Sequence, residues 1–165
     1  MNRSDPYFKL RSPPPTPADE ICSCEGNKPI KLMQALGSNP LHCIDCNLEV
    51  APESLSISES LVEEVANWSS LRGAFEMLWL DSGAYEDWAK DQLMDIGSPV
   101  NQQGIALRRK LEAIRRCYYW YFQDETDESF EPLTLCPACS QPLSKYSDGI
   151  FPQLICQSCA LIMAE

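Results

Sequence analysis

Nine cysteines are the residues of this 165-residue chain whose type and spacing point most directly to chemistry. The clearest set lies near the C-terminus, where two Cys-x-x-Cys pairs are separated by sixteen residues: Cys136, Cys139, Cys156 and Cys159. Each short turn directs two sulfurs to one point, and two such turns on neighbouring hairpins complete a tetrahedron around Zn²⁺. Four thiolates leave no coordination position for a substrate, so this set predicts a structural zinc site.

A second set of four cysteines lies in the first third of the chain: Cys22, Cys24, Cys43 and Cys46. The second pair has regular spacing, whereas Cys22-Ser-Cys24 has one intervening residue. We predict a second four-cysteine zinc site, hence two Zn²⁺ per chain. The only histidine, His42, could replace one cysteine, but neighbours in a strand point to opposite faces, which favours the all-cysteine set. An iron–sulfur cluster could use the same cysteines, although the zinc-like spacing of the C-terminal set favours zinc.

The ninth cysteine, Cys117, is left without a partner in either set, and we interpret it as a buried structural thiol. A catalytic thiol needs a base, and His42 lies far away in sequence. The same single histidine argues against serine-type hydrolases. A thioredoxin-type redox pair requires one Cys-x-x-Cys that opens a helix, and the doubled motif argues against it.

Charge and hydropathy limit the class of partner. Thirteen Lys and Arg face 24 Asp and Glu, which gives a net charge of −11. Extensive binding to nucleic-acid phosphates is therefore disfavoured, because it needs clustered cations. No apolar run approaches the ~20 residues of a membrane-spanning helix, and the first nineteen residues lack the apolar core of a secretion signal. We expect a cytoplasmic protein that does not enter a membrane, in a reducing compartment where paired cysteines bind metal.

The middle of the chain, residues 53–116, has the apolar periodicity of about three helices. Ser58 is the expected N-cap of the first helix, and Asp81-Ser82-Gly83 is its expected end. Ser98 and Pro99 should begin the third helix. The apolar positions expected in the core are Leu61, Val65, Trp68, Phe75, Leu78, Trp79, Tyr85, Trp88, Leu93, Leu107, Leu111 and Ile114.

The flanking segments read as short strands. Residues 117–122, Cys-Tyr-Tyr-Trp-Tyr-Phe, have the aromatic density of a strand. Residues 21–50 should form two short hairpins around their metal. The C-terminal ribbon should be backed by a few apolar side chains, namely Leu143, Phe151, Leu154 and Ile155.

These elements predict an α+β fold in which two small zinc-ribbon modules bracket a helical middle of about three helices. The expected segments are a proline-rich tail or linker over 1–20, an N-terminal ribbon-like module over 21–52, the helical region 53–116, and the aromatic strand with the C-terminal ribbon over 117–165.

The C-terminal third resembles a bacterial family described as zinc-ribbon-containing and possibly nucleic-acid-binding. The resemblance rests on the aromatic run 118–121, the Cys136-Pro-Ala-Cys139 knuckle and the closing Cys156-Gln-Ser-Cys159-Ala-Leu, and it covers roughly residues 117–165. The family often has glycine after the first knuckle, where this chain has Ser140. The resemblance implies metal binding by the four C-terminal cysteines.

Three functions compete on this basis. The favoured one is a non-enzymatic zinc protein that binds another protein through its acidic helices and ribbon edges. The first alternative is a nucleic-acid binder that uses the basic helix 108–116 beside aromatic side chains, which net charge disfavours. The second alternative is an enzyme with an acidic site around Asp81, Glu86 and Asp87, where no spacing indicates a particular reaction.

Overall fold

The computed structural model describes residues 5–11, 14–35 and 37–165, and its fold is the predicted mixture of helices and strands. The tail predicted over residues 1–20 lies partly outside this range, at residues 1–4 and 12–13. The helices are α1 (Glu59–Asp81), α2 (Glu86–Met94) and α3 (Pro99–Glu112). The strands are β1 (Ile30–Leu32), β2 (Leu41–Cys43), β3 (Cys117–Trp120), β4 (Ser144–Lys145), β5 (Gln153–Cys156) and β6 (Leu161–Ala164).

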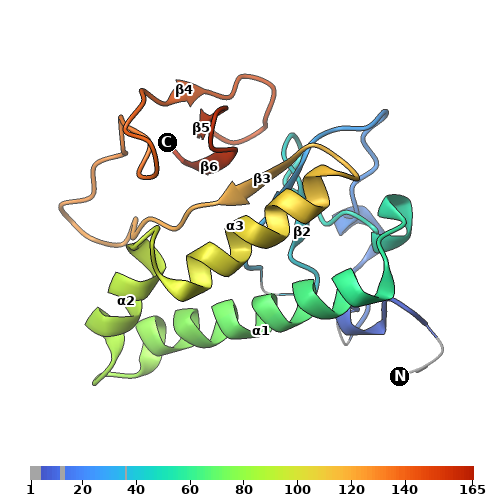
Figure 1. The fold of residues 1–165 in the computed structure, drawn as a ribbon, viewed down its shortest axis with the longest axis horizontal. Helices are drawn as coiled ribbons and strands as arrows, with labels where there is room; N and C mark the ends of the chain where they lie inside the picture. Colours follow the sequence, from blue (N-terminus) through green and yellow to red (C-terminus); the bar gives the residue numbers. More distant parts are fainter. Residues whose placement is uncertain (1–4, 12–13, 36) are drawn as a thin grey trace.

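All six strands belong to one sheet in the order β2-β1-β3-β6-β5-β4. The hairpins β1–β2 and β5–β6 are antiparallel, whereas β3 runs parallel to both β1 and β6 and lies between them. The helices pack together beside this sheet, with α3 next to β3 (Figure 1). The aromatic strand therefore connects both cysteine-bearing hairpins, a role that the sequence indicated only for the C-terminal one.

The helix boundaries follow from their caps. The hydroxyl of Ser58 accepts a hydrogen bond from the Leu61 amide at 3.3 Å, and that of Ser98 accepts one from the Asn101 amide at 3.4 Å. Each bond satisfies one of the amides that have no partner inside the helix. Pro99 occupies the first turn of α3, where its missing N–H costs nothing. Both predicted caps are confirmed.

Three predictions of detail are wrong. Tyr85 and Trp88 are 60% and 51% exposed, because the short α2 buries only Ala89 and Leu93 on its inner side. Phe151 is also exposed, since it precedes β5 in a loop and does not back the ribbon. Ile114 is 44% exposed, because α3 ends at Glu112 and Ile114 lies beyond it.

The two short hairpins expected within residues 21–50 are present. One is β1–β2, and in the other residues 41–43 pair antiparallel with residues 48–50 around the Cys43–Cys46 turn.

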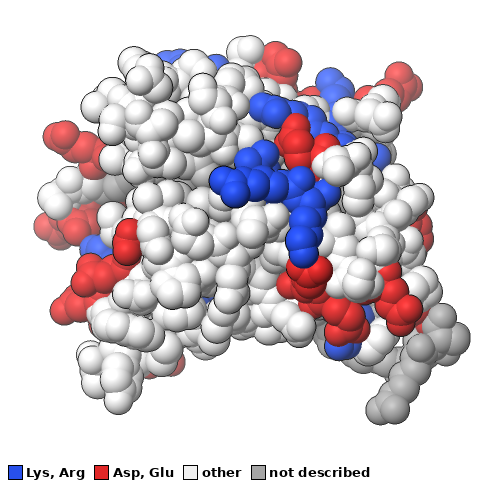
Figure 2. Space-filling view, viewed as in Figure 1, with Lys and Arg blue, Asp and Glu red and all other residues white. Residues whose placement is uncertain are grey.

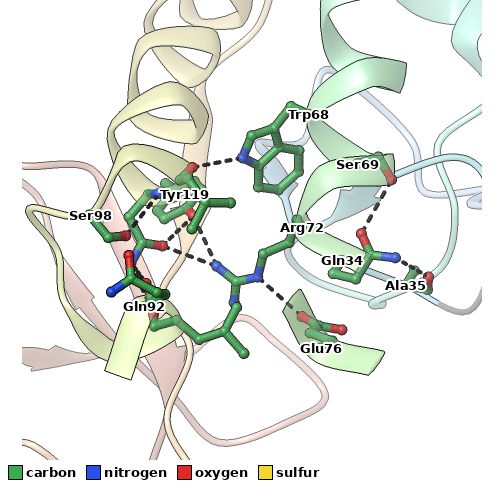
Figure 3. A network of polar contacts seen from close by, with 12 residues as sticks. Gln34, Ala35, Trp68, Ser69, Arg72, Glu76, Gln92, Ser98 and Tyr119 are labelled. Atoms are coloured by element: carbon green, nitrogen blue, oxygen red, sulfur yellow. Dashed lines mark hydrogen bonds and ion pairs between the residues drawn. The ribbon is translucent and has the colours of Figure 1, made fainter. Parts of the chain in front are cut away.

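A buried polar network joins α1, α3 and β3 (Figure 3). The Arg72 side chain is 2% exposed, and its guanidinium donates to the Asn101 amide oxygen at 3.0 Å and to the Tyr119 hydroxyl at 3.1 Å. It also pairs with Glu76 at 3.2 Å. The Trp68 indole donates to the Val100 carbonyl at 3.0 Å. Because a buried charge is costly unless it is paired, these contacts fix how the helices sit on β3.

Close packing at this network generates a test on one glycine of α3. A Cβ atom on Gly104 would lie 2.2 Å from Cε2 of Tyr119 and 2.9 Å from Nε1 of Trp68. We expect Gly104→Ala to lower the free energy of unfolding by about 1–3 kcal/mol, because overpacking outweighs the gain in helix propensity. The measurement is urea unfolding followed by circular dichroism.

The matched control is Gly73→Ala in α1, where the nearest atom to an added Cβ is the flexible Gln34 amide at 3.1 Å. That variant should be as stable as the parent or up to about 1 kcal/mol more stable, since alanine is the better helix former. Equal stability of the two variants would show that Gly104 is not packed against Tyr119 as described.

Candidate metal centres

The four C-terminal cysteines converge as their spacing predicts. Cys156 ends β5, and the turn to Cys159 leads into β6, while Cys136 and Cys139 lie in a turn before β4. Their sulfur atoms all lie within 4.8 Å of one another, and the Sγ atoms of Cys139 and Cys156 are 3.6 Å apart. A tetrahedron with Zn–S bonds of about 2.3 Å places its sulfurs about 3.8 Å apart. The donor set therefore fits one tetrahedral thiolate-bound metal.

The four N-terminal cysteines converge equally well, with all sulfurs within 4.8 Å. Cys43 ends β2, and Cys46 closes the turn that follows it. Cys22 reaches the site because its amide donates to the Glu49 carbonyl at 2.7 Å, next to the bridge between Ile21 and Glu49. This anchoring explains how the irregular Cys-x-Cys pair can reach the same point as a regular knuckle.

Three of the knuckles end in the same strained backbone conformation. The residues directly after Cys46, Cys139 and Cys159 all have positive φ: Asn47 at 61°, Ser140 at 57° and Ala160 at 50°. Left-handed backbone is unfavourable for residues with a Cβ, except for asparagine and aspartate, which tolerate it better. In two of these turns the amide of the left-handed residue donates to the first cysteine's carbonyl, at 3.0 Å for Asn47 and 2.8 Å for Ser140. Ser140 thus takes the left-handed position for which glycine is the usual residue.

The surroundings of three C-terminal thiols shift their pKa values and so determine which of them still carry a proton that a metal must displace. The backbone amide of Gln141 lowers the pKa of Cys139 to about 7, whereas burial raises the pKa of Cys136 and of Cys159. Some of the four thiols are therefore protonated at neutral pH when no metal is bound. Metal binding releases these protons, so metal affinity decreases as the pH falls.

His42 lies outside the N-terminal sulfur group. Its Nδ1 atom is 2.9 Å from the carbonyl oxygen of Asn47, and burial lowers the pKa of its imidazole. The group of ligand atoms that converges here consists of the four cysteines. This arrangement favours the all-cysteine interpretation over the one in which His42 replaces a cysteine.

Cys117 is buried, in agreement with its interpretation as a structural thiol. Burial raises its pKa to about 12, so the nucleophilic thiolate is scarce at neutral pH. Its sulfur contacts the Tyr118 carbonyl at 3.7 Å, and its amide donates to Glu112 at 2.9 Å.

Two contacts between the cysteine-bearing modules were not predicted. Asp45, which lies inside the Cys43–Cys46 turn, accepts a hydrogen bond from the Tyr146 hydroxyl at 2.5 Å. The Asp45 carbonyl accepts a second bond from the Ile150 amide at 2.8 Å. Both donors, Tyr146 and Ile150, lie between β4 and β5. The N-terminal knuckle is therefore hydrogen-bonded directly to the C-terminal ribbon.

Lys31 is a further residue whose contacts near the cysteines were not predicted from the sequence. It occupies the middle of β1 and is 1% exposed, with its ammonium 4.6 Å from the centre of the Trp120 ring and 3.3 Å from the Gln153 amide oxygen. Burial lowers its pKa to about 8, while the negative charge of the Cys43 and Cys46 thiolates acts in the opposite direction. The only signal in the sequence was a lysine between two apolar residues of a short strand.

The basic cluster at the end of α3 is largely engaged within the molecule. Arg108 and Arg116 both pair with Glu112, at 3.5 Å and 2.8 Å, and Lys110 pairs with Glu64 of α1. Arg115 donates to the Ser54 carbonyl at 3.3 Å. Figure 2 shows these basic side chains gathered on one face beside acidic ones.

No protein-family model, curated protein or solved structure matches this chain. Among the described residues, every helix is too short or too polar to cross a membrane.

The contrast between the cysteines of the two sulfur groups and Cys117, which belongs to neither, gives a direct test of the ligand assignment. We expect Cys139→Ser to lose the C-terminal metal and to unfold residues 133–165, because structural zinc in small modules contributes on the order of 10–16 kcal/mol of apparent binding free energy. Most of the helical circular dichroism should persist, since the helices pack through apolar side chains and the Arg72 network. The measurement is zinc content together with circular dichroism.

Cys117→Ser is the control, because it removes a thiol that lies outside both sulfur groups. It should keep the parent's zinc content. Full zinc retention in Cys139→Ser, or zinc loss in Cys117→Ser, would show that the ligands are assigned wrongly.

Proposed function

We propose that this protein is a non-enzymatic zinc protein in which two structural four-cysteine sites brace one sheet, and that it acts by binding another protein. The observation that carries the proposal is the convergence of two separate sets of four sulfurs, each within 4.8 Å. All eight donors are thiols, which favour zinc or an iron–sulfur cluster over hard cations such as Mg²⁺ and Ca²⁺.

The donor sets support a structural role in preference to a catalytic one. Catalytic zinc keeps one position open for water or substrate, whereas four thiolates occupy every position. The acidic residues considered for an enzyme do not form a convergent site. Asp81 and Asp87 are exposed, and Glu86 accepts a bond from the Gly83 amide at 2.8 Å, at the start of α2.

The relation to zinc ribbons is part of the proposal. It is supported by the β5–β6 hairpin, whose connecting turn carries Cys156-Gln-Ser-Cys159, as in the family that the C-terminal third resembles. The left-handed residues that follow Cys46, Cys139 and Cys159 add to this support, because the tight turn of a zinc knuckle needs a left-handed residue after its second cysteine.

A protein partner is favoured over nucleic acid by the charges. Eight metal-bound thiolates add −8 and two Zn²⁺ add +4, so the net charge moves from −11 to −15. Four of the five basic side chains near the end of α3 already contact Glu64, Glu112 or the Ser54 carbonyl, and the fifth, Arg109, is exposed. A phosphate backbone would have to displace these contacts against the repulsion of the whole molecule.

The proposal is tested by elemental analysis of the protein purified from cells grown without added metal. We expect two zinc atoms per chain. A ratio near one would remove the N-terminal site, and abundant iron would overturn the assignment of zinc.

A further inference from the structure

An apolar groove runs between α1 and α3 on the face shown in Figure 2. Its volume is about 380 Å³. Trp68 and Leu107 are buried and form its floor, while Leu71 and Ala106 are exposed along its rim. At one end of the groove, Glu64 and Lys110 pair with each other.

The apolar surface continues from the groove toward α2. Leu71 is 39% exposed, and Phe75 follows it one helical turn later on the same side of α1. The centre of the Phe75 ring lies 5.4 Å from that of the Trp88 ring. About half of Trp88 remains exposed to solvent. Large exposed aromatic and aliphatic side chains that adjoin a groove are typical of protein-binding surfaces.

The two ends of this surface differ in charge: Lys110 lies at one end beside the other basic side chains of α3, and carboxylates gather at the α2 end, where they select the partner. Residues 73–107 contain six carboxylates and one lysine, and that lysine, Lys90, pairs with Asp124 at 2.7 Å and with Asp127 at 3.4 Å. Asp91 is exposed and lies one turn after Trp88 on α2. The α2 end of the surface therefore presents carboxylates that no cation of this segment neutralises.

We infer that the groove between α1 and α3 binds an amphipathic, positively charged helical segment of another protein. An apolar side chain of that helix would lie between Trp68 and Leu107, and its lysines or arginines would face the carboxylates of α2. A second copy of this chain is disfavoured as the occupant, because two molecules of net charge −11 repel each other. The inference rests on the proposed protein-binding function and specifies its partner.

The test uses a fluorescein-labelled model peptide of fourteen leucines and lysines arranged as an amphipathic helix, with binding followed by fluorescence anisotropy. A peptide of the same composition in scrambled order is the peptide control. We expect the amphipathic peptide to bind at least about tenfold more tightly than the scrambled one, because only a continuous apolar face fits the groove.

Two variants of α1 with the same change of charge locate the site. Leu71→Lys places a cation in the groove and should weaken binding at least tenfold. Met77→Lys changes an exposed residue of the same helix that does not line the groove, and it should alter binding by less than about threefold. Both positions are solvent-accessible, so the fold should be kept, as circular dichroism will show.

Several results would overturn the inference: equal binding of the two peptides, equal effects of the two variants, tighter binding of a labelled single-stranded DNA than of the peptide, or self-association of the chain that Leu71→Lys abolishes. Zinc analysis of each variant separates the two proposals. Peptide binding at the groove without bound zinc would contradict the zinc sites alone, whereas two zincs without peptide binding would contradict the groove alone.

Discussion

The parallel pairing of β3 with two hairpins is the interaction on which the rest of the structure depends. The Ile30 amide donates to the Arg116 carbonyl at 2.9 Å on one side, and on the other the Tyr119 and Tyr121 amides donate to the carbonyls of Ala160 and Ile162 at 2.9 Å and 2.8 Å. Two-stranded hairpins are marginally stable alone. Here each hairpin is completed by a shared strand. One four-cysteine group lies at the end of β2 away from the β1–β2 turn, and the other includes the two cysteines at the β5–β6 turn.

The two faces of this sheet contact different parts of the molecule. One face carries Tyr119 toward the helices, where the Arg72 network and the close approach of Gly104 fix its position. The other carries Lys31 and Trp120, and the Lys31 ammonium contacts both the Trp120 ring and the Gln153 amide oxygen of β5. Together with the bond between Asp45 and Tyr146, these contacts link the two cysteine-bearing modules through side chains as well as through the backbone. The helices are thereby held on a sheet that has a group of four converging sulfurs on each side of β3.

Local signals in the sequence were sufficient for much of this account. The cysteine sets, the caps at Ser58 and Ser98 and the aromatic strand all depend on residues close together in the chain, and the structure places them as expected. The pairing of β3 with β1 joins residues more than eighty positions apart, and no local pattern encodes it. Trp88 was assigned to the core because its spacing is helical, but a nine-residue helix has a narrow inner side that Ala89 and Leu93 fill. Lys31 was overlooked because its partners come from distant strands.

Hydrogen exchange at β3 is the measurement that tests this coupling most directly. Cys46→Ser removes one ligand of the N-terminal site and lies far in sequence from the C-terminal ribbon. If β3 transmits the stability of one hairpin to the other, this variant will increase the exchange rates of the Tyr119 and Tyr121 amides at least about tenfold. Unchanged protection of both amides in a variant that has lost its N-terminal zinc would show that the two metal sites stabilise independent modules, and would contradict the account.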